Sequence, residues 1–397
     1  MPTPATLLVT LTGADRPGVT STLFRELAPL DVEVLDLQQV VVRGRLTLDL
    51  LLSGGDLSAA ATTATATAAA LGMEVSTEPG EGNSSRNRTG RAAVVLLGAP
   101  LRASHLAAAA ATIAEQGANI DRIRRLSHYP VTTVELDLSG ADLPRLRPAL
   151  AQVAAGSGVD IAVAPGGLAR RGRRLVVMDV DSTLIRDEVI ELIAAHAGTA
   201  DDVAAVTEQA MRGELDFADS LRHRVATLAG TPVSALEEVR QQVRLTPGAR
   251  TLVRTLHRLG FTIALVSGGF EEIVRPLAED LGIRLVRANR LAVRDGVLTG
   301  HVEGTVVDRA GKAAALREFA AAEGLPMART VAIGDGANDL DMLAAAGLGV
   351  AFNAKPLVRA QADTAVNVPY LDAVLFLLGI SREEIEEADS EDELSSG

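Results

Sequence analysis

The sequence predicts an α/β protein in which two small antiparallel modules precede a larger, doubly wound parallel sheet. Two stretches without apolar periodicity, residues 79–91 and 165–174, divide the 397-residue chain. The segments that they bound first, 5–78 and 92–164, share one order of strands and helices. The third segment, 175–380, alternates strands with helices, which is typical of a parallel sheet.

The composition excludes several classes of protein. Apolar residues make up 47% of the chain, but no apolar run reaches the roughly 18 residues of a membrane span. We therefore expect no membrane partner. The absence of Cys excludes a thiol nucleophile, and the start of the chain lacks the features of a secretory signal, so we expect a cytoplasmic location. A net charge of −13 and 2% aromatic residues argue against nucleic acid as a partner.

Much of the negative charge lies at the C-terminus. Between Arg382 and Gly397 the chain has eight acidic residues and one Arg. A run of like charges is solvated and seldom packs, so we expect an acidic, disordered tail over 382–397, after a frayed helix end.

The first two segments are repeats of each other. Each opens with an apolar strand, Ala5–Thr12 in one and Ala92–Leu97 in the other, and each strand runs into a Gly-Ala pair. A helix, two strands joined by a tight turn, a second helix and a short strand follow in both. The order βαββαβ predicts a ferredoxin-like fold with both helices on one face of an antiparallel sheet.

The first repeat resembles the ACT amino-acid-sensing domains at the turn Gly13-Ala14-Asp15-Arg16-Pro17-Gly18-Val19. Backbone approaches a ligand closely at a glycine, and N–H groups at a helix start suit a carboxylate. The resemblance implies an effector site at Asp15 and Gly18, L-serine as a candidate effector, and a homodimer. The alternative is an ordinary strand-to-helix turn. The second repeat reads GAPLRA here, which lacks both the Asp and the second Gly, so its motif is degenerate.

The third segment has polar side chains at its strand ends, where ligands of such sheets bind. Asp179 and Asp181 follow the strand Leu175–Met178, and side chains two residues apart in an extended segment share a side. Two crowded carboxylates repel each other unless a divalent cation or a raised pKa relieves them.

Three further features belong to the same pattern. Ser267-Gly268-Gly269 follow the strand Phe261–Val266, ahead of a helix, and form a natural phosphate cradle. Lys312 opens the helix 311–322 and offers a point charge to a phosphoryl oxygen. The strand 330–333 ends in an oxygen-rich cluster that suits Mg²⁺, made up of Asp335, Asn338 and Asp339.

In this order the four features resemble the haloacid dehalogenase superfamily of phosphotransferases. The resemblance implies that Asp179 is a nucleophile forming an aspartyl phosphate and that Asp181 is the general acid and base. Ser267 and Lys312 would hold the phosphoryl group. Asp179, the backbone carbonyl of Asp181 and Asp335 would bind Mg²⁺, with Asp339 in support. The carboxylate at position 181 favours hydrolysis over a long-lived phosphoenzyme.

Residues 184–246 have the apolar spacing of helices and predict a small cap over the site. Within the cap, the positions of Glu188 and Arg224, with Met211 and Phe217 between them, are similar to those of phosphoserine phosphatases. This resemblance implies that Glu188 receives the substrate ammonium and that Arg224 pairs with its carboxylate, a bidentate role that Lys does not fill. Asn338, Gly268 and Gly269 complete the expected substrate site. The alternative is a solvated Glu and Arg on helix faces.

The sequence thus predicts Mg²⁺-dependent hydrolysis of O-phospho-L-serine, the last step of serine biosynthesis. Two alternatives stay open at this point. One is a related enzyme with another phosphomonoester or with an alcohol, such as homoserine, as phosphoryl acceptor. The other is an inactive, amino-acid-sensing protein, against which the intact set of strand-end residues argues.

Overall fold

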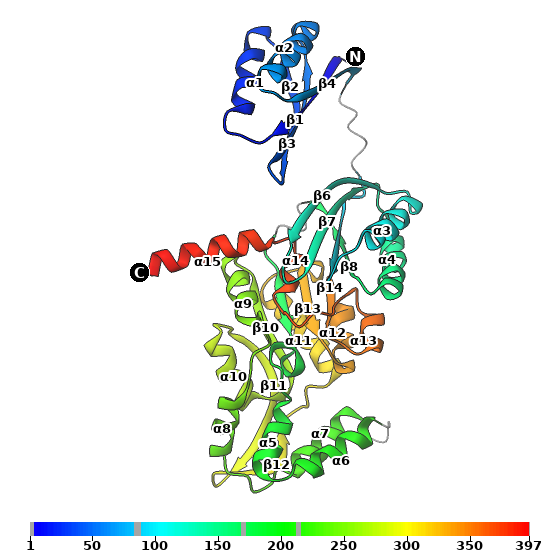
Figure 1. The fold of residues 1–397 in the computed structure, drawn as a ribbon. Coiled ribbons are helices and arrows are strands. Elements are labelled where there is room, and N and C mark those ends of the chain that lie inside the picture. Colours follow the sequence, from blue (N-terminus) through cyan, green and yellow to red (C-terminus); the bar gives the residue numbers. More distant parts are fainter. Residues whose placement is uncertain (1–3, 83–88, 168–171, 212–215, 397) are drawn as a thin grey trace. The chain divides into compact units, whose positions relative to one another are not determined.

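A computed structural model describes residues 4–82, 89–167, 172–211 and 216–396 (Figure 1). The chain divides into two compact units, Met1–Asn87 and Arg88–Gly397. No helix among the described residues is long and apolar enough to cross a membrane.

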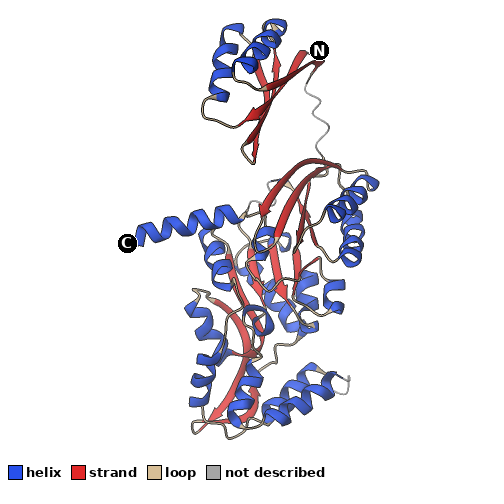
Figure 2. Cartoon of the chain, in the orientation of Figure 1, coloured by secondary structure: helices blue, strands red, loops and turns tan. Residues whose placement is uncertain are grey.

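The first unit has the predicted ferredoxin-like plan. Its antiparallel sheet has the order β2-β3-β1-β4, and two helices cover one face (Figure 2). Alternate residues of the central strand, Leu7, Val9 and Leu11, are buried against the helices. The strands are β1 (Ala5–Ala14), β2 (Glu33–Val42), β3 (Arg45–Ser53) and β4 (Glu74–Glu81), and the helices are α1 (Val19–Leu27) and α2 (Leu57–Ala70).

Strand β2 is one of the two edges of this sheet, and all ten of its residues are exposed. Apolar side chains on both of its faces meet solvent, among them Val34, Leu37, Val40 and Val42. An exposed apolar edge strand is a template for pairing with another chain, which soluble proteins ordinarily avoid.

The second unit begins with the other ferredoxin-like module, whose sheet has the order β6-β7-β5-β8. Its strands are β5 (Ala92–Gly98), β6 (Asn119–Ser127), β7 (Thr132–Ser139) and β8 (Asp160–Pro165), and its helices are α3 (Ala103–Glu115) and α4 (Leu143–Ser157). Every residue of β5 is buried, in contrast to the alternating β1. A strand that is buried on both faces is typically a continuous run of apolar residues, and the sequence of β5, AAVVLLG, is such a run.

The rest of the second unit is the predicted doubly wound domain. Its sheet has the order β12-β11-β10-β9-β13-β14-β15, in which all pairs are parallel except the hairpin β11–β12. The strands are β9 (Leu175–Met178), β10 (Thr262–Phe270), β11 (Leu285–Arg294), β12 (Val297–Glu303), β13 (Thr330–Gly334), β14 (Leu348–Phe352) and β15 (Thr364–Val366).

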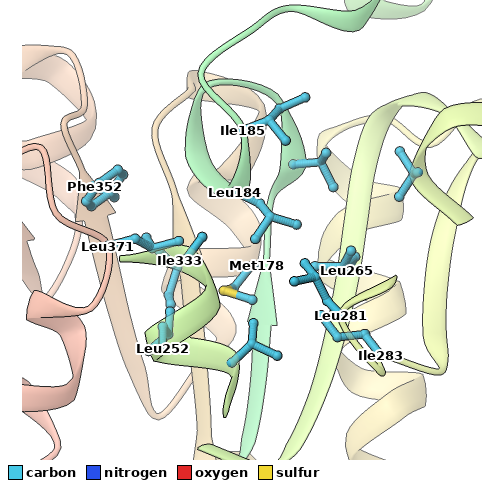
Figure 3. Close-up of a cluster of buried hydrophobic side chains, with 14 of the residues drawn as sticks. Met178, Leu184, Ile185, Leu252, Leu265, Leu281, Ile283, Ile333, Phe352 and Leu371 are labelled. Carbon is cyan, nitrogen blue, oxygen red and sulfur yellow. The ribbon is translucent and has the colours of Figure 1, made fainter. Parts of the chain in front are cut away.

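Helices cover both faces of this sheet, and the central strand shows the division. Met178 and Val176 face one hydrophobic cluster, while Leu175 and Val177 face the other. Figure 3 shows the first cluster, in which Met178 lies among Leu184, Leu252, Leu265 and Ile333. The helices are α5 (Val189–Ala197), α6 (Ala200–Met211), α7 (Phe217–Ala226), α8 (Ser234–Gln242), α9 (Ala249–Arg258), α10 (Glu271–Asp280), α11 (Arg309–Ala322), α12 (Leu340–Ala345), α13 (Pro356–Gln361), α14 (Ala373–Leu377) and α15 (Arg382–Ser396). The four from α5 to α8 lie in the stretch predicted as a helical cap.

The second module shares its core with this domain. Val95, Leu97 and Ala162, on the sheet face that its own helices leave open, belong to the same buried cluster as Met178. Polar contacts border the junction. The Asn367 backbone N–H donates to buried Asp160 (2.8 Å), and Thr364 Oγ1 donates to the Ile161 carbonyl (3.0 Å). The second module and the doubly wound domain therefore form one compact unit.

The expectation of a disordered tail over 382–397 is wrong for Arg382–Ser396, which form the helix α15. Specific partners hold this helix in spite of its charge. Ile385 is buried, Arg382 pairs with Asp372 (3.3 Å), and Asp389 pairs with both Arg254 and Arg258 of α9. Charge counting along the sequence missed these arginines because they lie more than a hundred residues away.

This division of the chain predicts different outcomes for two truncations. A chain starting at residue 88 keeps the second unit whole, and we expect its melting temperature to match that of the full chain's main transition. A chain starting at residue 165 exposes the apolar surface that β5 and β8 cover, so its melting temperature should fall by roughly 10 °C or more. Calorimetry and size-exclusion chromatography measure both. Equal melting temperatures for the two truncations would contradict the shared core.

Candidate active site

A pocket of about 470 Å³ opens at the carboxyl edge of the parallel sheet. It brings together residues from the strand ends and from the helices α5 and α7. Predicted site residues make up much of its lining: Asp179, Asp181, Glu188, Phe217, Arg224, Gly268, Gly269, Asp335 and Asn338. Ser267, Lys312 and Asp339 are fully buried directly behind these residues.

Asp179 follows β9 and has both carboxylate oxygens engaged. The backbone N–H of Val180 donates to Oδ1 (2.7 Å), and Lys312 Nζ lies 2.8 Å from Oδ2. The side chain of Asp179 is almost completely buried. Burial raises its pKa well above the ordinary value, and the nearby carboxylate of Asp339 raises it further, whereas Lys312 opposes the rise. Both oxygens of Asp179 are therefore held in fixed positions.

Lys312, in the first turn of α11, is a buried cation between two carboxylates. Its ammonium lies 2.7 Å from Asp339 Oδ1 as well as 2.8 Å from Asp179 Oδ2. Burial by itself would lower the pKa of Lys312, but the two carboxylates outweigh it and raise the pKa. The lysine therefore stays charged and links Asp179, which follows β9, to Asp339, in the turn that follows β13.

Asp181 and Ser267 form a second hydrogen-bonded group. Ser267 Oγ donates to Asp181 Oδ2 (3.2 Å) and accepts from the Gly269 N–H (2.7 Å), while the Val189 N–H donates to Asp181 Oδ1 (2.8 Å). Burial raises the pKa of Asp181 above its usual range, and the Val189 hydrogen bond partly offsets the rise. A raised pKa suits a group that has to donate a proton near neutral pH.

The predicted oxygen cluster forms after β13. Carboxylate oxygens of Asp179, Asp335 and Asp339 lie within 4.8 Å of one another. Asp335 accepts from Thr183 Oγ1 (3.0 Å), and burial followed by the Asp339 charge raises its pKa to about 6. Both carboxylate oxygens of Asp339 have protein partners. Oδ1 accepts a hydrogen bond from Lys312 Nζ, and Oδ2 accepts hydrogen bonds from the backbone N–H groups of Asp335 and Gly336.

The chemistry of this donor set fits a divalent cation. Three crowded carboxylates with one compensating lysine leave excess negative charge, and carboxylate oxygens are the ligands that hard divalent ions prefer. Asp179 and Asp335 line the pocket, whereas Asp339 is fully buried behind them. An ion in the pocket could therefore reach the carboxylates of Asp179 and Asp335, with Asp339 behind them.

Glu188 and Arg224 line the same pocket from the cap helices. Glu188, directly before α5, accepts a hydrogen bond from Ser182 Oγ (2.7 Å). Burial, followed by the charge of Asp181, raises the pKa of Glu188 to about 7. Burial lowers the pKa of Arg224, and the charge of Glu188 opposes this change, as expected for two groups that face one space.

Phe217, the first residue of α7, lies against the glycines of β10. A Cβ on Gly268 would be 2.9 Å from the Phe217 ring, so only glycine leaves room for this approach of cap to core. The side chain of Met211, the last residue of α6, lies outside the described part of the chain.

One detail differs from the sequence-based expectation. The strand β10 continues through Ser267-Gly268-Gly269 to Phe270, and α10 begins at Glu271. The serine and glycines therefore lie in the last, irregular part of the strand, where its register against β11 shifts, and not after the strand.

Sequence reasoning missed several residues that position the site. Ser182 holds Glu188, Thr183 holds Asp335, and Asn289 donates to the Gly268 carbonyl (2.8 Å). The hydroxyl pair next to Asp181 was a signal for the first two, but nothing in the sequence marked Asn289. A further wall of the pocket comes from Lys355, Leu357 and Val358, at the start of α13.

The predicted effector residues lie in the first unit, at the turn from β1 to α1. Asp15 is exposed, and its N–H donates to the Gly44 carbonyl (2.8 Å). Gly18 has φ +98° immediately before α1, a conformation that residues with a side chain rarely adopt.

Comparisons with known proteins match all three parts of the chain to families. Residues 176–344 match the haloacid dehalogenase-like hydrolases, and residues 5–78 and 91–164 each match an ACT domain.

The chain is similar over its whole length to known enzymes. It is 58% identical to the phosphoserine phosphatase of Streptomyces coelicolor and 52% identical to phosphoserine phosphatase SerB2 of Mycobacterium tuberculosis. In each case the match covers 99% of this chain and 97% of the relative. A solved structure of a substrate-bound phosphoserine phosphatase complex is 40% identical, with a TM-score of 0.50, over 52% of this chain and 98% of that one.

The carboxylate cluster predicts a stabilising response to divalent cations. Saturating Mg²⁺ should raise the melting temperature of the second unit by roughly 5 °C, because the ion binds the folded state alone. Asp335→Asn should remove most of this rise, without lowering the melting temperature in the presence of EDTA, since it also removes a repelling charge. Asp341→Asn is the matched control, because Asp341 pairs with Arg309 (2.6 Å) outside the cluster. An undiminished rise in the Asp335→Asn variant would place the ion elsewhere.

Proposed function

We propose, from the premise that this chain belongs to the phosphoserine phosphatases among the haloacid dehalogenase-like hydrolases, that it hydrolyses O-phospho-L-serine to L-serine and phosphate. One observation carries the proposal. The carboxylate of Asp179 is fixed by Lys312 beside Asp181, at the base of a pocket whose cap offers both an anion and a cation. The group of Asp179, Lys312 and Asp181 suits phosphoryl transfer. The anion and the cation of the cap suit the ammonium and the carboxylate of an amino acid.

The first step is attack by a carboxylate oxygen of Asp179 on phosphorus. The bond between phosphorus and the seryl oxygen breaks, and an aspartyl phosphate forms. Asp181, the pKa of which is raised by burial, donates a proton to the departing seryl oxygen. Ser267 and Lys312 stand behind the two aspartates and offer donors to the phosphoryl oxygens.

The second step is hydrolysis of the aspartyl phosphate. Asp181, now a carboxylate, takes a proton from the attacking water, the oxygen of which bonds to phosphorus. The bond between phosphorus and the Asp179 oxygen breaks, which releases phosphate and restores the nucleophile. The Val189 N–H and Ser267 hydroxyl keep Asp181 in one position through both proton transfers.

Mg²⁺ is the ion that we propose for the carboxylate cluster. Asp179, Asp335 and the backbone carbonyl of Asp181 would hold it, with Asp339 in support. When bound, the ion supplies positive charge that offsets the negative charge of the phosphoryl group and of the nucleophile. Asp339 acts through its neighbours, since it fixes Lys312 on one side and the turn after β13 on the other.

Substrate selection is the proposed role of the cap. Glu188 would receive the ammonium and Arg224 the carboxylate of phosphoserine, while Phe217 and Asn338 border the remaining space. Glu188 lies directly before α5 and Arg224 lies in α7, so both belong to the cap. In this proposal the cap binds the amino-acid part of the substrate, and the sheet edge binds the phosphate.

We also propose a cytoplasmic homodimer that responds to L-serine through the first ACT domain. The exposed apolar strand β2 supports pairing with a second copy, because such an edge is stabilised by a partner strand. The turn at Asp15 and Gly18 supports an effector site, since it offers N–H groups at a helix start and a nearby carboxylate.

The proposal predicts that Asp179→Asn abolishes phosphate release from phosphoserine, because the amide is not a nucleophile for phosphorus. Asp181→Asn should retain the nucleophile and lose on the order of 10²–10⁴-fold in kcat. Phosphate release with Mg²⁺ and without added alcohol measures both. If Asp179→Asn kept a tenth of the wild-type activity, the covalent mechanism would be wrong.

A second prediction concerns Arg224. Arg224→Ala should lower kcat/KM for phosphoserine by roughly ten- to a hundred-fold more than for p-nitrophenyl phosphate, which has no carboxylate to pair. Arg222→Ala is the matched control, because Arg222 lies on the same helix but is exposed and pairs with Asp219 (2.8 Å). Equal losses on the two substrates would show that Arg224 supports the cap and does not read the carboxylate.

A third prediction concerns the effector. L-serine should inhibit the full chain non-competitively, and the chain starting at residue 88 should show only competitive product inhibition. Coupling of about 1–3 kcal/mol corresponds to a five- to 150-fold change in activity. Steady-state kinetics with varied serine and phosphoserine separates the two patterns. Unchanged non-competitive inhibition in the truncated chain would locate the effector site outside the first ACT domain.

A further inference from the structure

The distribution of lysine in this chain is unusual. Of the 38 cationic side chains, only Lys312 and Lys355 are lysines, and all the others are arginines. Arg and Lys are not interchangeable where a compact, rotatable ammonium is needed in place of a planar fork. The two Lys positions therefore stand out in a chain that uses Arg almost everywhere.

Both lysines lie at the proposed active site. Lys312 touches the nucleophile Asp179. Lys355 follows β14 and lines the pocket, together with Leu357 and Val358 of α13. Since β9, β13 and β14 are neighbours in the sheet, Lys355 stands at the same carboxyl edge as Asp179 and Asp335. Chance would seldom place both lysines of the chain at one pocket.

The ammonium of Lys355 has no hydrogen bond or ion pair within the described ranges, and the residue is exposed. Its neighbour Arg359, one helical turn further along α13, donates to Asn367 (3.3 Å). Lys355 is therefore a free charge at the solvent side of the pocket. An arginine in its place would present a fork suited to the pocket carboxylates and would compete with a ligand for them.

The pocket lining has more negative than positive side chains. Four carboxylates line it, from Asp179, Asp181, Glu188 and Asp335, while the cations among its described lining residues are Arg224 and Lys355. A phosphate dianion that approaches this opening meets like charge. Arg224 lies on the cap and is half-buried, so Lys355 is the cation that an entering anion meets from the core side.

We propose that Lys355 is a substrate-binding residue that captures the phosphate dianion at the opening of the pocket and lowers the electrostatic barrier to its entry. The proposal rests on the proposed function, because a dianionic phosphomonoester is the ligand it concerns. Lys312 and Ser267 hold the phosphoryl group during the chemical steps, and Lys355 acts before them. Its effect therefore falls on kcat/KM and not on kcat.

The test compares Lys355→Gln and Lys355→Arg with the wild type at ionic strengths of about 0.01 M and 0.5 M. At low salt, where the screening length is about 30 Å, Lys355→Gln should lower kcat/KM for phosphoserine roughly three- to ten-fold with kcat unchanged. High salt should remove most of the difference. Lys355→Arg keeps the charge and should retain the salt dependence, but its guanidinium competes for the pocket carboxylates, so its kcat/KM at low salt should lie below that of the wild type. Arg359→Gln removes a charge one helical turn away that does not line the pocket, so it should lose clearly less than Lys355→Gln.

Two further measurements identify the anion that Lys355 meets. Phosphoethanolamine, which lacks the carboxylate, should lose as much as phosphoserine in Lys355→Gln, and competitive inhibition by inorganic phosphate should weaken by a similar factor. A loss confined to phosphoserine would show that the residue reads the carboxylate and would overturn the proposal. So would a fall in kcat, an unchanged kcat/KM at low salt, or an equal loss in Arg359→Gln. Failure of the wild type itself to hydrolyse phosphoserine would instead overturn the proposed function.

Discussion

The buried ammonium of Lys312 is the interaction on which the rest of the site depends. It lies within 2.8 Å of Asp179 and 2.7 Å of Asp339, with no exposure to solvent. Two carboxylates buried at this separation would repel each other strongly without it. Asp339 in turn fixes the turn after β13 by accepting the N–H groups of Asp335 and Gly336. One cation thus joins the residue that follows β9 to the turn that follows β13.

The negative charge that Lys312 does not balance determines the electrostatics of the pocket. Asp179, Asp181 and Asp335 outnumber the single buried lysine, and the pKa of each is raised. Backbone has to pass very close to these groups, and a Cβ on Gly334 would be 2.4 Å from the Asp339 carboxyl carbon. The excess negative charge favours a bound divalent cation and raises the pKa of these carboxyl groups, and it opposes the approach of an anion.

The two ACT domains share a fold but differ in what covers their sheets. The first is a compact unit with an exposed edge strand, whereas the open face of the second shares a hydrophobic core with the catalytic domain. The polar contacts at that junction involve Asp363, Thr364 and Asn367, in and beside β15. Since β15 directly follows α13, which lines the pocket, the second domain supports one wall of the active site.

The sequence by itself predicted the fold class, the two repeats and the residues that gather at the carboxyl edge of the sheet. Periodicity and strand-end motifs are local, and the carboxyl ends of parallel strands necessarily meet at one edge, so Asp179, Lys312 and Asp335 could be assigned to one site. The contrast between β1 and β5 was also present in the sequence, as alternating against continuous apolar residues.

Only the tertiary structure decided which partners hold these elements. The helix α15 forms because Asp389 meets Arg254 and Arg258, and Asn289 supports the Gly268 carbonyl from a separate strand. Lys355 joins the pocket because β14 lies next to β13. Such contacts join residues that are distant along the chain, and no local pattern specifies them. Their energy depends on burial and on the closeness of opposite charges, which exist only once the chain has folded.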